Sequence, residues 1–119
     1  MLIGNITDCP EIINRDRTII RELLPMIRAD LNLRYSLAHA IIRPGQSSLP
    51  HRLISSEVYY ILEGNGIMHI DEEQAEVHFG QLICIPPNSK QYIESSGIGD
   101  LKFLCLVAPS WRSDNEEIL

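Results

Sequence analysis

The chain has 119 residues, of which 45% are hydrophobic and 22% charged, and it carries a formal net charge of -6. This length suits one domain with its own core, and an acidic chain with scattered Lys and Arg disfavours nucleic acid and anionic membranes as partners. No apolar run is long enough to span a membrane, and the first residues lack the features of a signal peptide. Three cysteines without paired spacing fit a reducing compartment, so we expect a cytoplasmic protein.

The first 33 residues carry two competing indications. Apolar residues follow helical spacing, but Pro25 interrupts any helix at this point. The segment by itself predicts a short helix, whereas in front of an all-β chain it equally fits an edge strand. In either case we expect residues 1–33 to form an extension that packs on the main domain. The apolar residues in question are Ile19, Ile20, Leu23, Leu24 and Ile27.

Residues 34–107 show short strand-like runs separated by turns. The runs are rich in alternating, β-branched and aromatic side chains, and Gly64-Asn65-Gly66 is a strong hairpin signal. Regular short strands of this kind predict an antiparallel sandwich or barrel. After them, we expect residues 108–119 to form a loose or lightly docked C-terminal tail with an acidic end. The expected strands cover residues 34–43, 57–63, 67–70, 74–78, 81–85, 90–94 and 101–107.

A first polar run begins at Gly45, with His51, Glu57 and Gly64 following it at regular intervals. The spacing resembles the first sequence motif of the cupins, which are small barrels of the double-stranded β-helix type. That motif reads glycine, five residues, His-x-His, three or four residues, glutamate, six residues, glycine. In this chain Leu53 takes the place of the second histidine.

A second polar run resembles the second cupin motif. Gly80 and Pro86 match the motif, while Asn88 takes its glycine position, Gln91 its histidine position and Ser95 its asparagine position. Together the two motifs imply an all-β fold, a double-stranded β-helix (jelly-roll) cupin barrel with a short N-terminal extension. The resemblance extends to small cupins of the sugar-phosphate isomerase-like type, and it implies a homodimer.

Alternation along the strands predicts that three polar side chains meet in one cavity. Residues two apart share a strand face, so His51, Glu57 and Gln91 converge if these faces line the barrel. In one interpretation the three side chains hold a divalent cation such as Zn, Mn, Fe or Ni. One imidazole, one carboxylate and one amide form a weak ligand set for such a metal. In the other interpretation Glu57 accepts hydrogen bonds from His51 and Gln91 without a metal.

Further candidates lie on the same strand faces. Glu57 is the candidate catalytic residue, because a carboxylate in an apolar cavity must be paired or protonated. His39 adds a second imidazole if its strand face is interior, and is otherwise a core or interface residue. Trp111 is expected to cover a barrel edge or a partner subunit. The residues expected to contact a small-molecule ligand are Leu53, Tyr59, Ile61, Ile93 and His39.

Three functions remain open from the sequence. The first is binding of a small polar, sugar-like molecule at a weak metal site, with the Lewis-acid or proton-transfer chemistry of an isomerase. The second is a non-catalytic sensor or structural cupin without a metal. The third, an iron-dependent dioxygenase, normally needs more imidazole ligands. The expected homodimer would cover the apolar strand 101–107 on both faces.

Overall fold

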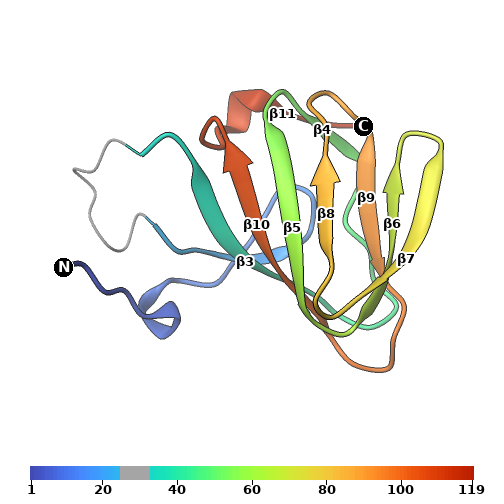
Figure 1. Ribbon diagram of the computed structural model, residues 1–119, viewed down its shortest axis with the longest axis horizontal. Coiled ribbons are helices and arrows are strands. Elements are labelled where there is room, and N and C mark those ends of the chain that lie inside the picture. The colour runs from blue at the N-terminus through green and yellow to red at the C-terminus, as the bar shows by residue number, and fades with distance from the viewer. Residues whose placement is uncertain (25–32) are drawn as a thin grey trace.

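The computed structural model describes residues 1–24 and 33–119, which form two antiparallel sheets packed against each other (Figure 1). The strands are β1 (Ile12–Ile13), β2 (Ile19–Glu22), β3 (Ser36–Ile42), β4 (His51–Leu53), β5 (Ser56–Glu63), β6 (Asn65–Ile70), β7 (Glu73–His78), β8 (Leu82–Ile85), β9 (Gln91–Ser95), β10 (Leu101–Ala108) and β11 (Glu116–Ile118). One sheet has the order β1-β2-β3-β10-β5-β8 and the other β11-β4-β9-β6-β7. The predicted all-β antiparallel class is therefore confirmed.

Helical structure is limited to two short 3-10 helices in the part of the chain that the structure describes. These are η1 (Ile6–Asp8) and η2 (Ser113–Asn115). No helix among residues 1–24 and 33–119 has the length and apolar character needed to cross a membrane.

The interior between the sheets is filled by side chains that alternate along the strands. Over most of β5 and β10 every second residue is buried, since residues two apart share a face. Ile61, Ile93 and Leu101 are inaccessible to solvent, and the ring centroids of Phe103 and Tyr59 are 4.4 Å apart. This packing holds β5 and β10 of the larger sheet against the smaller sheet.

The hairpin between β5 and β6 depends on the glycine that closes the first sequence motif. Gly64 has a φ angle of +87°, which favours glycine because other residues are strained there. A Cβ atom at this position would also collide with the backbone carbonyl oxygen of Asp100. Two independent constraints therefore require glycine at this turn.

The N-terminal extension joins the larger sheet as two strands. β2 pairs with the edge of β3, with Ile19 opposite Ile41 and Ile20 opposite Ala40. The edge-strand alternative therefore holds for the described part of the segment, because the free backbone groups of β3 find partners in it. Pro25 and Ile27, on which the alternative of a helix also depended, lie outside the described residues.

The C-terminal tail is docked, which is the second of the two arrangements that the sequence left open. β11 pairs with β4, with Glu116 opposite Leu53 and Ile118 opposite His51, and the backbone amide of Leu119 donates to the carbonyl of Pro50 at 2.9 Å. The physical reason is again an open sheet edge, since β4 would otherwise present unpaired backbone groups. Both terminal segments thus add strands to the sheets.

Candidate functional site

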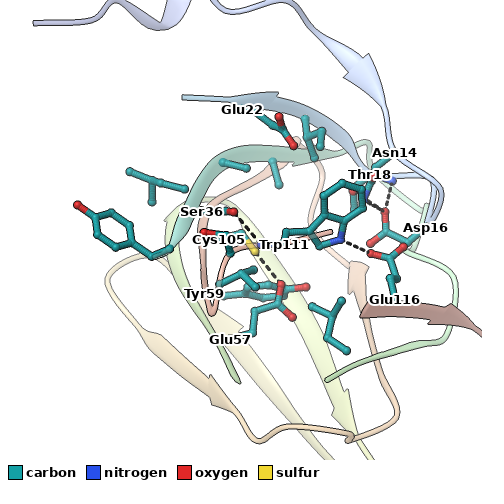
Figure 2. Close-up of a pocket in the computed structure, with 18 of the residues that line it drawn as sticks. Asn14, Asp16, Thr18, Glu22, Ser36, Glu57, Tyr59, Cys105, Trp111 and Glu116 are labelled. Carbon is teal, nitrogen blue, oxygen red and sulfur yellow. Dashed lines mark hydrogen bonds between the residues drawn. The ribbon is translucent and has the colours of Figure 1, made fainter. Parts of the chain in front are cut away.

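A cavity of about 370 Å³ lies within the barrel and is walled by both sheets and both terminal segments (Figure 2). β3, β5 and β10 supply one side, and β4 and β11 contribute residues of the smaller sheet. The hairpin of β1 and β2 and the segment around Trp111 complete the wall. The volume is within the usual range for small-molecule sites.

Glu57 lies at the centre of a buried hydrogen-bond network. Gln91 Nε2 donates to Glu57 Oε1 at 2.7 Å, and Cys105 Sγ donates to Glu57 Oε2 at 2.7 Å. The hydroxyl of Tyr59 donates to Gln91 Oε1 at 3.2 Å. Burial raises the pKa of the Glu57 carboxyl, and the hydrogen bonds from Cys105 and Gln91 only partly oppose that effect. The carboxyl is therefore able to hold a proton at a higher pH than an exposed glutamate.

The same burial suppresses ionisation of the two neighbouring acidic groups. It raises the pKa of the Tyr59 phenol and of the Cys105 thiol well above their usual values, and the nearby charge of Glu57 raises both further. Both side chains therefore remain protonated hydrogen-bond donors. Neither is a nucleophile or a ready metal ligand in this state, because thiolate is the reactive form of cysteine.

His51 is buried, and its two ring nitrogens have different surroundings. Nδ1 lies 2.7 Å from the backbone carbonyl oxygen of Leu49, which can only accept, so Nδ1 carries the proton. Nε2 lies 3.7 Å from Asp16 Oδ2. The neutral imidazole therefore presents an unprotonated Nε2, and Asp16 stands where it can stabilise the imidazolium that forms when Nε2 takes a proton.

Asp16 is positioned by the turn between β1 and β2. Its Oδ1 accepts hydrogen bonds from the Thr18 hydroxyl at 2.6 Å, the Thr18 amide at 3.1 Å and Asn14 Nδ2 at 3.2 Å. Sequence reasoning missed Asp16. Its only local signal is the polar turn Asn14-Arg15-Asp16-Arg17-Thr18 between two apolar pairs, a pattern that also fits an exposed turn.

Trp111 and Glu116 form the part of the wall that comes from the C-terminal segment. Trp111 Nε1 donates to Glu116 Oε2 at 2.9 Å, and the Trp111 amide donates to the Ser36 hydroxyl at 2.8 Å (Figure 2). Trp111 is half-buried and lines the cavity, a position that the expectation of an edge or partner contact did not include. Sequence reasoning missed Glu116 because it looked like part of a solvated acidic end.

The structure brings together most of the predicted site residues. His51, Glu57, Leu53 and Tyr59 line the cavity, and Gln91 lies directly behind Glu57 and Tyr59. The expected bond between Gln91 and Glu57 is present, but the second donor to Glu57 is Cys105 rather than His51.

Three residues expected to contact a ligand lie elsewhere. Ile61 and Ile93 belong to the packed core. His39 does not line the cavity, because Ala38 and Ala40 on either side of it point inward and strand neighbours alternate. On the outer face of β3, burial and the charges of Lys102 and Arg21 lower the pKa of His39.

The metal interpretation can be tested against the donors present. Residues 1–24 and 33–119 contain no group of three or more His, Cys, Asp and Glu side chains placed to hold a metal ion. Gln91 turns its NH₂ group to Glu57 and its oxygen to Tyr59, and Leu53 offers no donor beside His51. As arranged, these residues do not fit a firmly bound divalent metal.

Comparison with known proteins identifies the family. The family model for the cupin domain matches residues 38–107. Protein MJ1618 of Methanocaldococcus jannaschii is 44% identical over 109 residues, which are 90% of this chain and 86% of that protein. The plu4264 protein of Photorhabdus luminescens has a similar structure, with a TM-score of 0.74 and 26% identity over 89% of this chain and 83% of that one.

A second solved structure, of Streptomyces Pac13, is described as that of a nucleoside dehydratase. It has a TM-score of 0.79 and 16% identity, and the match covers 98% of this chain and 89% of that one. This likeness concerns the fold, in which two antiparallel sheets form the jelly-roll barrel that the two sequence motifs predicted. The chain belongs to the cupin family.

Proposed function

We propose that this cupin is an isomerase. It would act on a small polar molecule held in the barrel and catalyse proton transfer on it. One observation carries the proposal: a buried histidine has its Nδ1 proton committed to the Leu49 carbonyl and directs Nε2 toward Asp16 in a cavity. A base with a defined tautomer and a nearby carboxylate is suited to accept a proton from carbon or oxygen.

His51 and Glu57 have complementary properties for this chemistry. His51 Nε2 accepts a proton from the carbon next to a ligand carbonyl, and Asp16 stabilises the resulting imidazolium. Glu57 has a raised pKa, so it can supply its proton to the carbonyl oxygen and give an enediol. His51 then gives its proton to the former carbonyl carbon, and Glu57 recovers a proton from the hydroxyl on the adjacent carbon, which becomes the new carbonyl. This isomerisation of an α-hydroxy carbonyl compound needs no oxidant or co-reactant.

A second function is favoured by the state of Glu57 in the free protein. Both of its oxygens are already occupied by Gln91 and Cys105, as in a network that serves stability. A non-catalytic binding or sensor cupin would have this arrangement and would use the cavity for ligand affinity alone. An iron-dependent dioxygenase is less well supported, since the donor set around His51 is not that of an iron site.

Proton exchange with solvent separates the two functions. The protein is incubated in D₂O with small α-hydroxy and α-amino carbonyl compounds, and deuterium uptake at carbon is followed by NMR. His51→Asn keeps a donor for the Leu49 carbonyl and removes the base, so exchange should fall about 100-fold or more.

His78→Asn is the matched control. The exposed His78 also places Nδ1 near a backbone carbonyl, that of Phe79 at 3.1 Å, but it lies away from the cavity. This variant should exchange at the wild-type rate. Equal exchange in His51→Asn and wild type would remove the catalytic proposal and leave the binding function.

We also propose that two copies pair through the outer face of the larger sheet. Tyr60 of β5 lies opposite Leu104 of β10 and Leu82 of β8, and Val58 lies opposite Leu106. Tyr60 and Leu106 are partly exposed, and Leu82 is 66% exposed. A continuous apolar patch of this kind is typical of a protein interface.

A further inference from the structure

We propose that the ligand of this cavity is a cation, a protonated amine, and that Glu116 and Asp16 bind its ammonium group. Because this ammonium group would belong to the substrate of the proposed reaction, the proposal rests on the proposed function. It concerns the end of the cavity built by the two terminal segments, where Asp16 and Glu116 lie on the same side of the Trp111 ring (Figure 2).

The charge of the wall is the first observation. Three carboxylates line the cavity besides Glu57, which holds its proton more readily, and among the described lining residues His51 is the sole basic side chain, with no lysine or arginine. An anionic ligand such as a phosphate or a dicarboxylate would enter beside these carboxylates and find no lysine or arginine among the described lining residues to pair with. Like charges at short range in a poorly solvated site repel strongly. These carboxylates are Asp16, Glu22 and Glu116.

Glu116 supplies the second, independent observation. Its side chain belongs to a residue that is only 8% exposed, and its Oε2 accepts from Trp111 Nε1. Its Oε1 is buried and has no hydrogen-bond partner among the described residues. A buried carboxylate oxygen without a donor is unfavourable, and almost all such atoms in folded proteins find a partner. A ligand N–H group would supply the missing donor.

Asp16 has a free acceptor on the same side. Its Oδ1 is saturated by Thr18 and Asn14, whereas its Oδ2 lies 3.7 Å from His51 Nε2, too far for a good hydrogen bond. Asp16 Oδ2 and Glu116 Oε1 therefore both have unused capacity. An ammonium group has three donors and a positive charge, and so matches two carboxylate acceptors better than a neutral hydroxyl does.

Trp111 completes the subsite. Its indole lies on the cavity wall next to Glu116 and offers apolar surface to the body of a ligand. Asp16, Trp111 and Glu116 all fall outside residues 38–107, the part that matches the cupin model. The terminal segments of this chain therefore determine which ligand the barrel accepts.

The test uses three probes that share an aromatic body and differ in charge. They are 2-phenylethylamine, 2-phenylethanol and phenylacetate, titrated at neutral pH and followed by the fluorescence of Trp111, the chain's one tryptophan. We expect the amine to bind about tenfold or more tightly than the alcohol, and the acid to bind most weakly. Equal binding of the three probes, including no binding of any, would overturn the proposal.

Charge-removing variants locate the subsite. Glu116→Gln retains an oxygen for Trp111 Nε1 and should reduce the preference for the amine about tenfold. Asp16→Asn, which retains an acceptor for Thr18, is a second variant in case the first is unstable. Glu117→Gln changes the exposed neighbour on the same strand and should leave the preference unchanged. An unchanged preference in both cavity variants would also overturn the proposal.

The two proposals fail separately. His51→Asn should reduce deuterium exchange about 100-fold or more but preserve selectivity for the amine. If exchange does not depend on His51, catalysis is wrong while the charge preference can still be measured. If the amine preference is missing, the ligand class is wrong while exchange on neutral carbonyl compounds still reports catalysis.

Discussion

His51 Nε2 lies 3.7 Å from Asp16 Oδ2, so that a histidine of the cupin barrel faces a carboxylate of the N-terminal hairpin. Both side chains are buried, and each has its other polar atom committed to the backbone or to a neighbouring turn. The pair therefore has a fixed orientation before any ligand enters. This preorganisation is what a proton-transfer site requires, because the base need not be reoriented during the reaction.

Removing the Asp16 carboxylate should destabilise the fold as well as the site. Asp16→Ala leaves the Thr18 amide and hydroxyl and the Asn14 side-chain amide without their acceptor. We therefore expect a loss of about 1–3 kcal/mol in the free energy of unfolding. Asp16→Asn should lose less, since it keeps an acceptor. Urea denaturation measures both, and Asp114→Ala on the exposed surface is the control. Equal stabilities of Asp16→Ala and wild type would mean that the turn does not depend on this carboxylate.

The stability of the protein should depend on pH through Glu57. Folding raises the pKa of this carboxyl from its ordinary value of 4.5, so the folded state keeps the proton where the unfolded chain has released it. The favourable contribution is complete below the unfolded pKa and declines as pH rises through the folded pKa. Glu57→Gln cannot ionise, so its stability relative to wild type should increase as pH rises above 4.5.

Urea denaturation at several pH values tests this expectation. Glu72→Gln, which changes an exposed glutamate in the turn between β6 and β7, should give a difference from wild type that changes little with pH. A Glu57→Gln difference that stays constant, or that decreases with rising pH, would contradict the raised pKa.

Metal affinity should increase when the missing imidazole is restored. Leu53 is buried, lines the cavity and lies two residues after His51 on the same strand face. Leu53→His adds a nitrogen donor opposite Glu116, so we expect divalent metal affinity to rise about tenfold or more, with some loss of stability from the lost apolar contact. Titration with Zn²⁺ measures the change.

The control for this substitution is the adjacent residue. Ile54 is 60% exposed, and Ile54→His should not change Zn²⁺ affinity at the cavity. If Leu53→His gains no affinity over Ile54→His, then His51 and the neighbouring carboxylates cannot converge on one ion even with an added donor.

The proposed homodimer gives a direct prediction for mass in solution. Light scattering should report twice the mass of the chain, and Tyr60→Glu together with Leu106→Glu should give the single-chain mass, because charges would be buried in an apolar contact. Ile98→Glu, in a fully exposed loop position, should leave the assembly unchanged. A wild-type protein that already has the single-chain mass would disprove the interface.

Local pattern in the sequence determined most of the strands and turns between residues 34 and 107, but not β1, β4 or β11. Side-chain alternation and the Gly64 hairpin act over a few residues, so they can be recognised without a partner strand. The two motif runs also predicted that His51, Glu57 and Gln91 meet, since their spacing matches a known barrel. The structure places these residues together, with Gln91 bonded to Glu57.

Only the tertiary structure decided how the cavity is completed and which bonds form in it. Asp16 and Glu116 come from opposite ends of the chain and reach the cavity because β2 pairs with β3 and β11 with β4. Such pairings satisfy the backbone groups of open sheet edges, and the local sequence does not indicate which segment will pair with which edge. Alternation likewise could not tell which face of β3 is interior, and this choice placed His39 outside the site.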